Sequence, residues 1–210
     1  KRARGPFGRG PVWSTVAEIR TPTTSVEVVD LEWPKPVEYT WIDAKPVMTL
    51  MCRPAGYAAE GRYRDDRSGR GFARIGQVFF VPPDSELAGR GAGGGLRAAR
   101  CVFEPEFYAR MLGGAPRLDS GQLRRCLDMR GTLLPSLLKR LMEEAVSPGF
   151  ASAALAESLG IAILIEWARQ VLADPAERDR RGRLSPRQLR AIEDHVEGLE
   201  IGAPSVSDLA

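Results

Sequence analysis

The pattern of apolar and polar positions changes once along this chain, near residue 104. Before that point the segments are short, alternate in polarity and are separated by Gly, Pro and charged turns, as β-hairpins require. Eight such segments with no helix between them predict a sandwich or barrel. The expected strands are Trp13 to Arg20, Ser25 to Trp33, Tyr39 to Trp41, Pro46 to Arg53, Gly61 to Tyr63, Phe72 to Val81, Glu86 to Gly89 and Leu96 to Phe103.

One of these segments, Ser25 to Trp33, does not alternate regularly. Its apolar positions are Val26, Val28, Val29, Leu31 and Trp33, so the alternation slips by one residue. An extra residue in a strand produces such a slip. We therefore expect a β-bulge within this segment.

From Glu104 onward the spacing of apolar residues becomes helical. We expect helices at Pro105 to Leu112, Ser120 to Met129, Leu133 to Ala145 and Ser152 to Ala173. The last of these is apolar around most of its circumference, and such a helix must be covered on several sides. One β core covers one side, so we infer that a second copy of the chain covers another. The candidate dimerisation residues are Leu155, Leu159, Ala162, Ile163, Glu166 and Trp167.

The C-terminal part of the chain begins with a polar, charged stretch at 174–184 that has no apolar periodicity and indicates a linker. Ser185 is then placed to cap a helix with Pro186 at its first position. The apolar residues of this expected helix, Leu189, Ile192 and Val196, share one face. After a Gly-Ala-Pro break, a second helix is expected to begin at Asp208.

The closing run "Ser205-Val-Ser-Asp-Leu-Ala" after such a helix resembles the start of the DNA-binding region of AraC-type transcriptional regulators, the AraC/XylS family. Three further segments are similar to that family in the same order. "Arg74-Ile-Gly-Gln-Val-Phe-Phe-Val-Pro-Pro" resembles its segment leading into a Pro-Pro turn, and "Arg100-Cys-Val-Phe-Glu-Pro-Glu-Phe" its last strand before the helices. "Glu157-Ser-Leu-Gly" is similar to its dimerisation region.

The resemblance implies an α+β fold, in which an N-terminal cupin-like antiparallel β-barrel precedes a helical dimerisation region. It implies a flexible arm at 1–13, the barrel at 14–104, the helical region at 105–173, a linker at 174–184 and an incomplete helix-turn-helix domain at 185–210. It further implies a homodimer that senses a small organic effector and controls transcription. The partner DNA would be bound through the domain continuing beyond Ala210, where the recognition helix is expected, so no DNA-binding residue is named.

Composition narrows the class further. The chain has 210 residues, of which 43% are hydrophobic and 27% charged, enough for one sizeable core. Three cysteines without paired or metal-type spacing favour a reducing compartment, so we expect a cytoplasmic protein. No apolar run reaches the roughly 18 residues that a membrane helix needs, and no signal peptide is apparent. The net charge of +3 does not by itself indicate nucleic-acid binding.

Enzymes on the same barrel fold hold a divalent metal with several imidazoles and a carboxylate. This chain has one histidine, His195, which lies far in sequence from every expected strand. The same scarcity removes Ser-His-Asp and Cys-His nucleophile systems. The adjacent acids Asp65 and Asp66 lie among arginines in a Gly-containing loop, where a solvated hairpin tip is the simpler interpretation. We therefore expect no catalytic residue, no metal and no cofactor.

The stretch Gly89 to Gly94 formally satisfies the dinucleotide pattern G-x-G-x-x-G. A cofactor loop of that kind must open a helix whose N-terminus receives the pyrophosphate. The residues that follow, Leu96 to Phe103, alternate like a strand instead. The glycines therefore indicate a hairpin turn.

For effector binding the sequence supplies candidates. Pockets for small organic ligands combine apolar and aromatic walls with a few polar groups. Residues of those kinds on the expected strands and turns are Trp41, Met51, Arg53, Tyr57, Tyr63 and Phe79. Arg53 is the candidate partner for a ligand carboxylate. The sequence does not show which face of each strand points into the barrel. The alternatives are that these residues fill the core of a ligand-independent dimerisation module or, less favoured, of a metal-dependent cupin enzyme.

Overall fold

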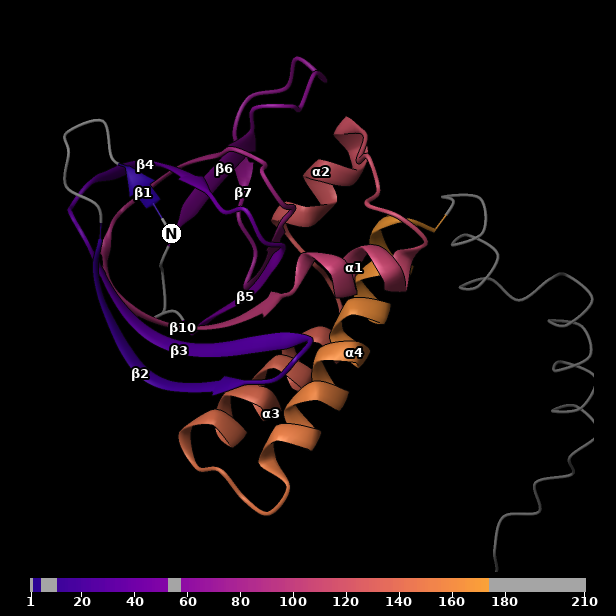
Figure 1. The fold of residues 1–210 in the computed structure, drawn as a ribbon. Helices are drawn as coiled ribbons and strands as arrows, with labels where there is room; N and C mark the ends of the chain where they lie inside the picture. The colour runs from indigo at the N-terminus through magenta and orange to yellow at the C-terminus, as the bar shows by residue number, and fades with distance from the viewer. Residues whose placement is uncertain (1, 5–10, 53–57, 174–210) are drawn as a thin grey trace, which may run out of the picture. The chain divides into compact units, whose positions relative to one another are not determined.

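The computed structural model describes residues 2–4, 11–52 and 58–173, which form two antiparallel five-stranded sheets followed by helices (Figure 1). One sheet has the order β2-β3-β10-β5-β8 and the other the order β1-β4-β9-β6-β7. The strands are β1 (Arg2–Arg4), β2 (Val12–Arg20), β3 (Thr24–Trp33), β4 (Val37–Ile42), β5 (Val47–Cys52), β6 (Ala59–Tyr63), β7 (Ala73–Arg74), β8 (Val78–Val81), β9 (Leu87–Gly91) and β10 (Gly94–Phe103).

The strand pairing is nested in chain order. β3 pairs with β10, β4 with β9, β5 with β8 and β6 with β7, each pair antiparallel. A chain paired in this way is one long hairpin folded over on itself, with its tip between β6 and β7, and this arrangement is a jelly roll of the kind found in cupins. The expected α+β fold with an N-terminal cupin-like β region is therefore confirmed.

Four helices follow the last strand: α1 (Pro105–Leu112), α2 (Ser120–Leu127), α3 (Leu133–Val146) and α4 (Ser152–Val171). The expected helices are confirmed to within two residues at most ends. A capping box fixes the start of α2, because Asp119 accepts from the Gln122 backbone while the Gln122 side chain accepts from the Asp119 backbone. Gly113, with φ of 70°, ends α1 in the left-handed conformation that favours glycine.

α3 and α4 pack on the outer face of the β2-β3-β10-β5-β8 sheet, side by side beneath β2 and β3 in Figure 1, and α2 lies against β6, β7 and β8. Trp167 of α4 lies with its ring centroid 4.3 Å from that of Phe80 on β8 and 5.7 Å from that of Tyr108 on α1. α4 also approaches β3 closely at Gly160, where a Cβ atom would lie 2.8 Å from Cγ2 of Thr24. The sheet and the four helices thus share one core. None of the helices in the described part of the chain is long and apolar enough to cross a membrane.

The irregular alternation in β3 has a different cause from the one expected. β3 pairs with β10 in continuous register, so β3 contains no bulge on that side. Its residues are apolar on both faces because Val26 and Val28 face the helices while Leu31 and Trp33 line the interior. The bulge belongs to the neighbouring strand β2, where the register shifts between Thr15 and Ala17.

The expected single strand Phe72 to Val81 is two strands in different sheets. β7 belongs to the sheet of β6, and β8 to the sheet of β5. The chain crosses between the sheets at 75–77, where the Ile75 amide donates to Ala59 and the Gln77 carbonyl accepts from Met51. Gly76 is required there because a Cβ atom would lie 2.0 Å from Oδ1 of Asp128. Alternation alone does not reveal such a crossing.

The first residues of the chain also differ from expectation. The segment 1–13 was predicted to be a flexible arm, but Arg2–Arg4 forms β1 and pairs antiparallel with β4, and β2 begins at Val12. The predicted linker at 174–184 and the predicted helix-turn-helix start at 185–210, with His195, lie outside the described residues. Those two predictions remain untested.

Candidate functional site

An internal cavity of about 50 Å³ lies between the two sheets of the jelly roll. Every strand from β2 to β10 except β7 contributes to its wall, through the residues at inward-facing positions. Five of these side chains are aromatic and two are polar, the remainder being aliphatic. The aromatic residues are Trp13, Trp33, Tyr39, Trp41 and Phe79, and the polar ones are Thr49 and Arg100.

Arg100 is the charged residue of this wall. Its side chain is 3% exposed and donates through Nη1 to Glu27 Oε2 at 2.6 Å and through Nη2 to Asp43 Oδ2 at 3.1 Å. Glu27 lies directly opposite Arg100 in the β3–β10 register, and Asp43 follows β4 in the other sheet. Charges removed from water need partners of opposite sign, and these two carboxylates provide them. The Arg100 guanidinium consequently ties the two sheets together.

Two indole rings lie against the same guanidinium. Its Cζ is 4.9 Å from the ring centroid of Trp13 and 5.1 Å from that of Trp41, and the two rings are 5.8 Å apart. A planar cation over an aromatic face is attracted by the ring quadrupole, more strongly when water is excluded. On the same wall, the rings of Trp33 and Tyr39 lie 4.5 Å apart. The interior therefore presents aromatic surface around one buried, hydrogen-bonded charge.

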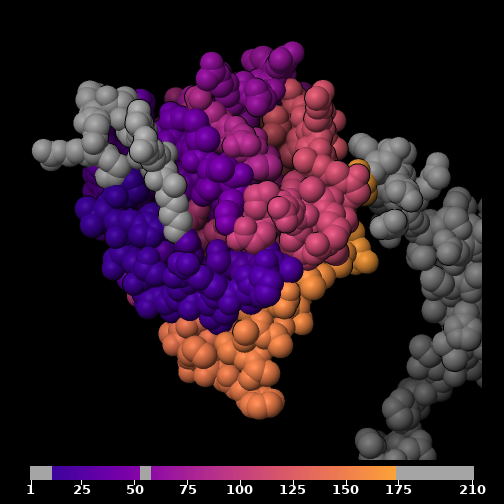
Figure 2. Space-filling view, viewed as in Figure 1, coloured from indigo at the N-terminus to yellow at the C-terminus, as the bar shows by residue number. Residues whose placement is uncertain are grey.

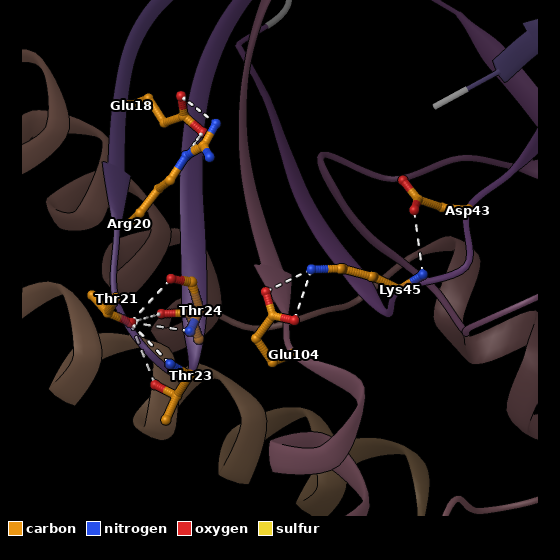
Figure 3. A network of polar contacts seen from close by, with 8 residues as sticks. All are labelled: Glu18, Arg20, Thr21, Thr23, Thr24, Asp43, Lys45 and Glu104. Atoms are coloured by element: carbon orange, nitrogen blue, oxygen red, sulfur yellow. Dashed lines mark hydrogen bonds and ion pairs between the residues drawn. The ribbon is translucent and has the colours of Figure 1, made fainter.

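A series of polar contacts leads outward from this charge (Figure 3). Asp43, which binds Arg100, also accepts from the Lys45 backbone at 3.3 Å. The Lys45 ammonium donates to both carboxylate oxygens of Glu104, at 2.6 and 2.7 Å. Glu104 is the N-cap residue of α1. The turn that holds Arg100 is thus connected through one ion pair to the start of the helical region.

The contacts continue from Glu104 to α4. The Glu104 amide donates to the Thr23 carbonyl at 2.9 Å, and the Thr23 hydroxyl donates to Glu157 Oε1 of α4 at 3.0 Å. Thr23 belongs to the tight turn between β2 and β3, which the Thr21 hydroxyl closes by bonding the Thr24 backbone and the Thr23 and Thr24 hydroxyls (Figure 3). The cavity and the surface of α4 are therefore linked by consecutive hydrogen bonds and ion pairs.

The predicted effector-binding residues are distributed unevenly. Trp41, Met51 and Phe79 line the cavity. Tyr63 does not: it is fully buried beside the cavity, its hydroxyl donates to the Phe80 carbonyl, and burial raises the pKa of its phenol well above the usual value. Arg53 and Tyr57 lie outside the described residues. Whether any of them binds a ligand stays a prediction.

Sequence reasoning missed the most polar part of the wall. Arg100 was not among the candidates, and neither were Trp13, Trp33 and Tyr39. A signal was present, because Glu27 lies between Val26 and Val28, and Arg100 lies between Ala99 and Cys101. An ion placed in such a position requires a buried partner. The sequence does not show which strands pair, so Arg100 could not be identified as the partner of Glu27.

The predicted dimerisation residues of α4 fall into two groups. Ile163 and Trp167 are fully buried within the single chain, and Trp167 contacts Phe80 of β8 and Tyr108 of α1. Their burial assigns them to the chain's own core, which corrects the prediction that they face a second copy. Leu155, Leu159, Ala162 and Glu166 are half-buried, and the neighbouring Ile165 is 37% exposed. For these residues the dimer contact stays a prediction.

No group of three or more His, Cys, Asp or Glu side chains with metal-binding geometry occurs among residues 2–4, 11–52 and 58–173. Within the cavity wall the ionised residue is an arginine, which is not a metal ligand.

The nested strand pairing and the interior cavity define this chain as an α+β protein with a cupin-like jelly roll. No protein-family model matches the sequence, and no curated protein sequence matches it. Among solved structures it is similar to the Clostridium difficile EutQ protein, with 13% identity over 45% of this chain and 69% of that one and a TM-score of 0.31.

Two further solved structures are similar in the same region. The cupin domain of Schizosaccharomyces pombe Cnp3 has 13% identity and a TM-score of 0.33, over 52% of this chain and 79% of that one. A cupin domain from Bordetella pertussis has 9% identity and a TM-score of 0.32, over 45% and 94%. At these values the strand pairing of the chain itself, rather than the similarity, carries the assignment of the fold.

Proposed function

We propose that this chain is the effector-binding and dimerisation portion of a cytoplasmic AraC-type DNA-binding transcriptional regulator, with the effector bound inside the jelly roll. The order of a jelly roll, a helical region and the "Ser-Val-Ser-Asp-Leu-Ala" run near the end supports this class. The role is binding rather than catalysis, because the interior offers an aromatic wall and one guanidinium but no base beside a nucleophile among its lining residues.

The observation that carries the proposal is the buried Arg100 in an aromatic cavity. Ligand sites in proteins are mostly apolar with a few placed polar groups that orient the ligand. Trp13 and Trp41, which both contact the guanidinium and lie next to each other, and Thr49 on the same wall supply that combination. A buried ion pair is often no more stabilising than apolar packing of the same volume, so the fold alone does not require a charge at this position.

The size of the cavity sets a condition on the effector. A volume of about 50 Å³ holds one or two water molecules, whereas sites for organic ligands typically measure about 300–1,000 Å³. An effector must therefore either consist of very few atoms or displace the indoles of Trp13 and Trp41. In the second case Asp43 moves with Arg100, and the Lys45–Glu104 pair carries the change to α1. Binding would then shift a conformational equilibrium of the helical region.

The test is a screen of the purified chain against small organic acids, aromatics, fatty acids, sterols and sugars, read by melting temperature and tryptophan emission. Three of the four tryptophans line the cavity, so a bound effector changes their emission as well as raising the melting temperature. Arg100→Lys should weaken both responses, because it keeps a cation beside Glu27 and Asp43 but removes the planar guanidinium. Arg97→Lys is the matched control, because Arg97 lies on the same strand but is exposed and paired with Asp30.

A second function is favoured by the cavity's small volume and by the two carboxylates that already satisfy Arg100. Under that proposal the jelly roll is a ligand-independent dimerisation module with a closed core. A screen with no saturable response in either readout, from a chain that is still dimeric in light scattering, would establish the module and end the sensor proposal.

A further inference from the structure

The tip of the jelly roll carries an unusual concentration of arginines. Between β6 and β7 the chain forms a hairpin that projects at the top of Figures 1 and 2. Exposed arginines stand on both strands and in the connecting turn. We call four of them the arginine hairpin: Arg62, Arg67, Arg70 and Arg74.

These four side chains differ from their neighbours in having no acidic partner among residues 11–52 and 58–173. Arg64 pairs with Glu86 at 3.1 Å, and Arg90 pairs with Glu60 at 2.7 Å. No carboxylate oxygen of the described residues lies within 4.0 Å of the arginine hairpin. Asp66, the acid nearest in sequence, is engaged by Arg124 at 3.2 Å, and its side chain is 3% exposed.

The hairpin is fastened to the body of the protein by Asp66, Arg124 and Ser120. Burial alone would raise the pKa of Asp66, but hydrogen bonds from Ser68 and Ser120 and the charge of Arg124 outweigh it and lower the pKa, so Asp66 is ionised at neutral pH. Arg124 donates to the Gly71 carbonyl at 3.0 Å, and the Arg67 amide donates to the Ser120 hydroxyl at 2.9 Å. The turn is thereby held against α2.

The strand part of the hairpin is ordered by an aromatic ring. The guanidinium carbons of Arg62 and Arg90 lie 5.7 and 4.5 Å from the ring centroid of Phe72, which is half-buried. Stacking of this kind restricts the orientation of a side chain that would otherwise be free. A partner that binds here meets one guanidinium group, that of Arg62, already oriented, which lowers the entropic cost of that contact.

We propose that the arginine hairpin is a second DNA-contacting surface, which binds the phosphate backbone of a duplex independently of base sequence. The guanidinium fork matches phosphate oxygens with two parallel hydrogen bonds. Contacts of this type position a protein on DNA without reading the bases. The choice of DNA among polyanions rests on the proposed function as a transcriptional regulator, while the anion-binding surface rests on the unpaired arginines alone.

The salt dependence of binding gives the proposal a quantitative form. Each phosphate neutralised on duplex DNA contributes about −0.9 to the slope of log K against log salt concentration. Four arginines that each contact one phosphate therefore contribute about −3.6. Removing one of them reduces the magnitude of the slope by about 1 and weakens binding to all sequences equally.

The experiment measures anisotropy of a labelled duplex of arbitrary sequence titrated with the 210-residue chain between about 50 and 200 mM salt. The test variant replaces Arg62, Arg67, Arg70 and Arg74 by Ser. The control variant replaces four other exposed cations by Ser and so makes the same change in net charge. They are Arg20, Arg97, Arg130 and Lys139, which lie on other parts of the chain. Far-UV circular dichroism and melting temperature confirm that both variants fold.

We expect the test variant to bind at least about tenfold more weakly at the lowest salt and to lose most of the slope, while the control keeps both. Equal weakening of the two variants, or no weakening of either, would overturn the proposal. Retention of both variants on a heparin column is measured as well. If the test variant is retained less but still binds the duplex as tightly as the unmodified chain, the proposal is also overturned, because the surface then binds another polyanion. None of these outcomes depends on whether an effector occupies the cavity, so the proposed sensor function stands or falls separately.

Discussion

Arg100 and Glu27 face each other across β10 and β3, and their side chains meet at 2.6 Å with only 3% and 9% of their surface exposed. The pair is completed by Asp43, which reaches Arg100 from the opposite sheet at 3.1 Å. Because the wall around them is aromatic and aliphatic, this cluster is the point where the chain departs from a purely apolar jelly-roll interior.

Arg100→Met is expected to lower the free energy of unfolding by about 3–5 kcal/mol, because it leaves two buried carboxylates without their cation. The double variant Arg100→Met, Glu27→Leu should recover part of that loss, since one of the unpaired charges is then gone. Urea unfolding followed by circular dichroism measures both. A loss below about 1 kcal/mol for the single variant would mean that water reaches the carboxylates.

The ion pair between Lys45 and Glu104 should behave differently although its contact is as short. Its side chains are 43% and 37% exposed, so solvent screens the pair and Lys45→Met should cost less than about 1 kcal/mol of stability. If the pair transmits effector binding to α1, the same variant should uncouple the two regions: cavity tryptophan emission still responds to the effector, but dimerisation no longer does. A variant in which both responses persist would exclude this route.

The strands and helices could be predicted from periodicity because alternation and helical spacing are local. Two features could not. The slip in β3 has its cause in burial on both faces, which depends on the helices α3 and α4 far along the chain. The crossing at Gly76 depends on the Asp128 side chain, 52 positions later, which excludes any larger residue there. Neither leaves a local pattern in the sequence.

The candidate site was predictable only in part for the same reason. Trp41, Met51 and Phe79 were found because aromatic and apolar residues on strands are natural lining residues. Arg100 was missed because its place on the inner face follows from the register with Glu27, which the sequence does not contain. Tyr63 was chosen on residue type, yet its neighbour Phe80 offers a backbone carbonyl that holds it beside the cavity instead.

The contact between α4 and β3 should tolerate no side chain at Gly160. A Cβ atom at this position would lie 2.8 Å from Cγ2 and 3.1 Å from Oγ1 of Thr24, which is fully buried. Gly160→Val is therefore expected to cost about 1–3 kcal/mol through overpacking. Ser158→Val, on the exposed side of the same helix, is the control for the propensity of valine. Equal unfolding midpoints for the two variants would contradict the close approach.

The three thiols should differ sharply in reactivity. Burial raises the pKa of Cys101 and Cys126 to about 12, so both are protonated and shielded at pH 8. Cys52 is half-buried, and burial raises the pKa of its thiol as well, but its Sγ remains near the surface, 3.8 Å from Sδ of Met142. Alkylation of the folded chain at pH 8, followed by intact mass, should add one group, and alkylation in urea should add three. Two or three additions to the folded chain would contradict the described packing.

The placement of Ile163 changes how the predicted dimer is best tested. Ile163 is fully buried, so Ile163→Glu places a charge in the core and should unfold the chain rather than separate two copies. Ile165 lies two positions away and is 37% exposed, so Ile165→Glu should leave the melting temperature nearly unchanged. If the outer face of α4 joins two copies, Ile165→Glu converts dimer to monomer in light scattering at tens of micromolar. A wild-type chain that is already monomeric at that concentration would contradict the dimer and would leave Ile165 as an ordinary exposed residue.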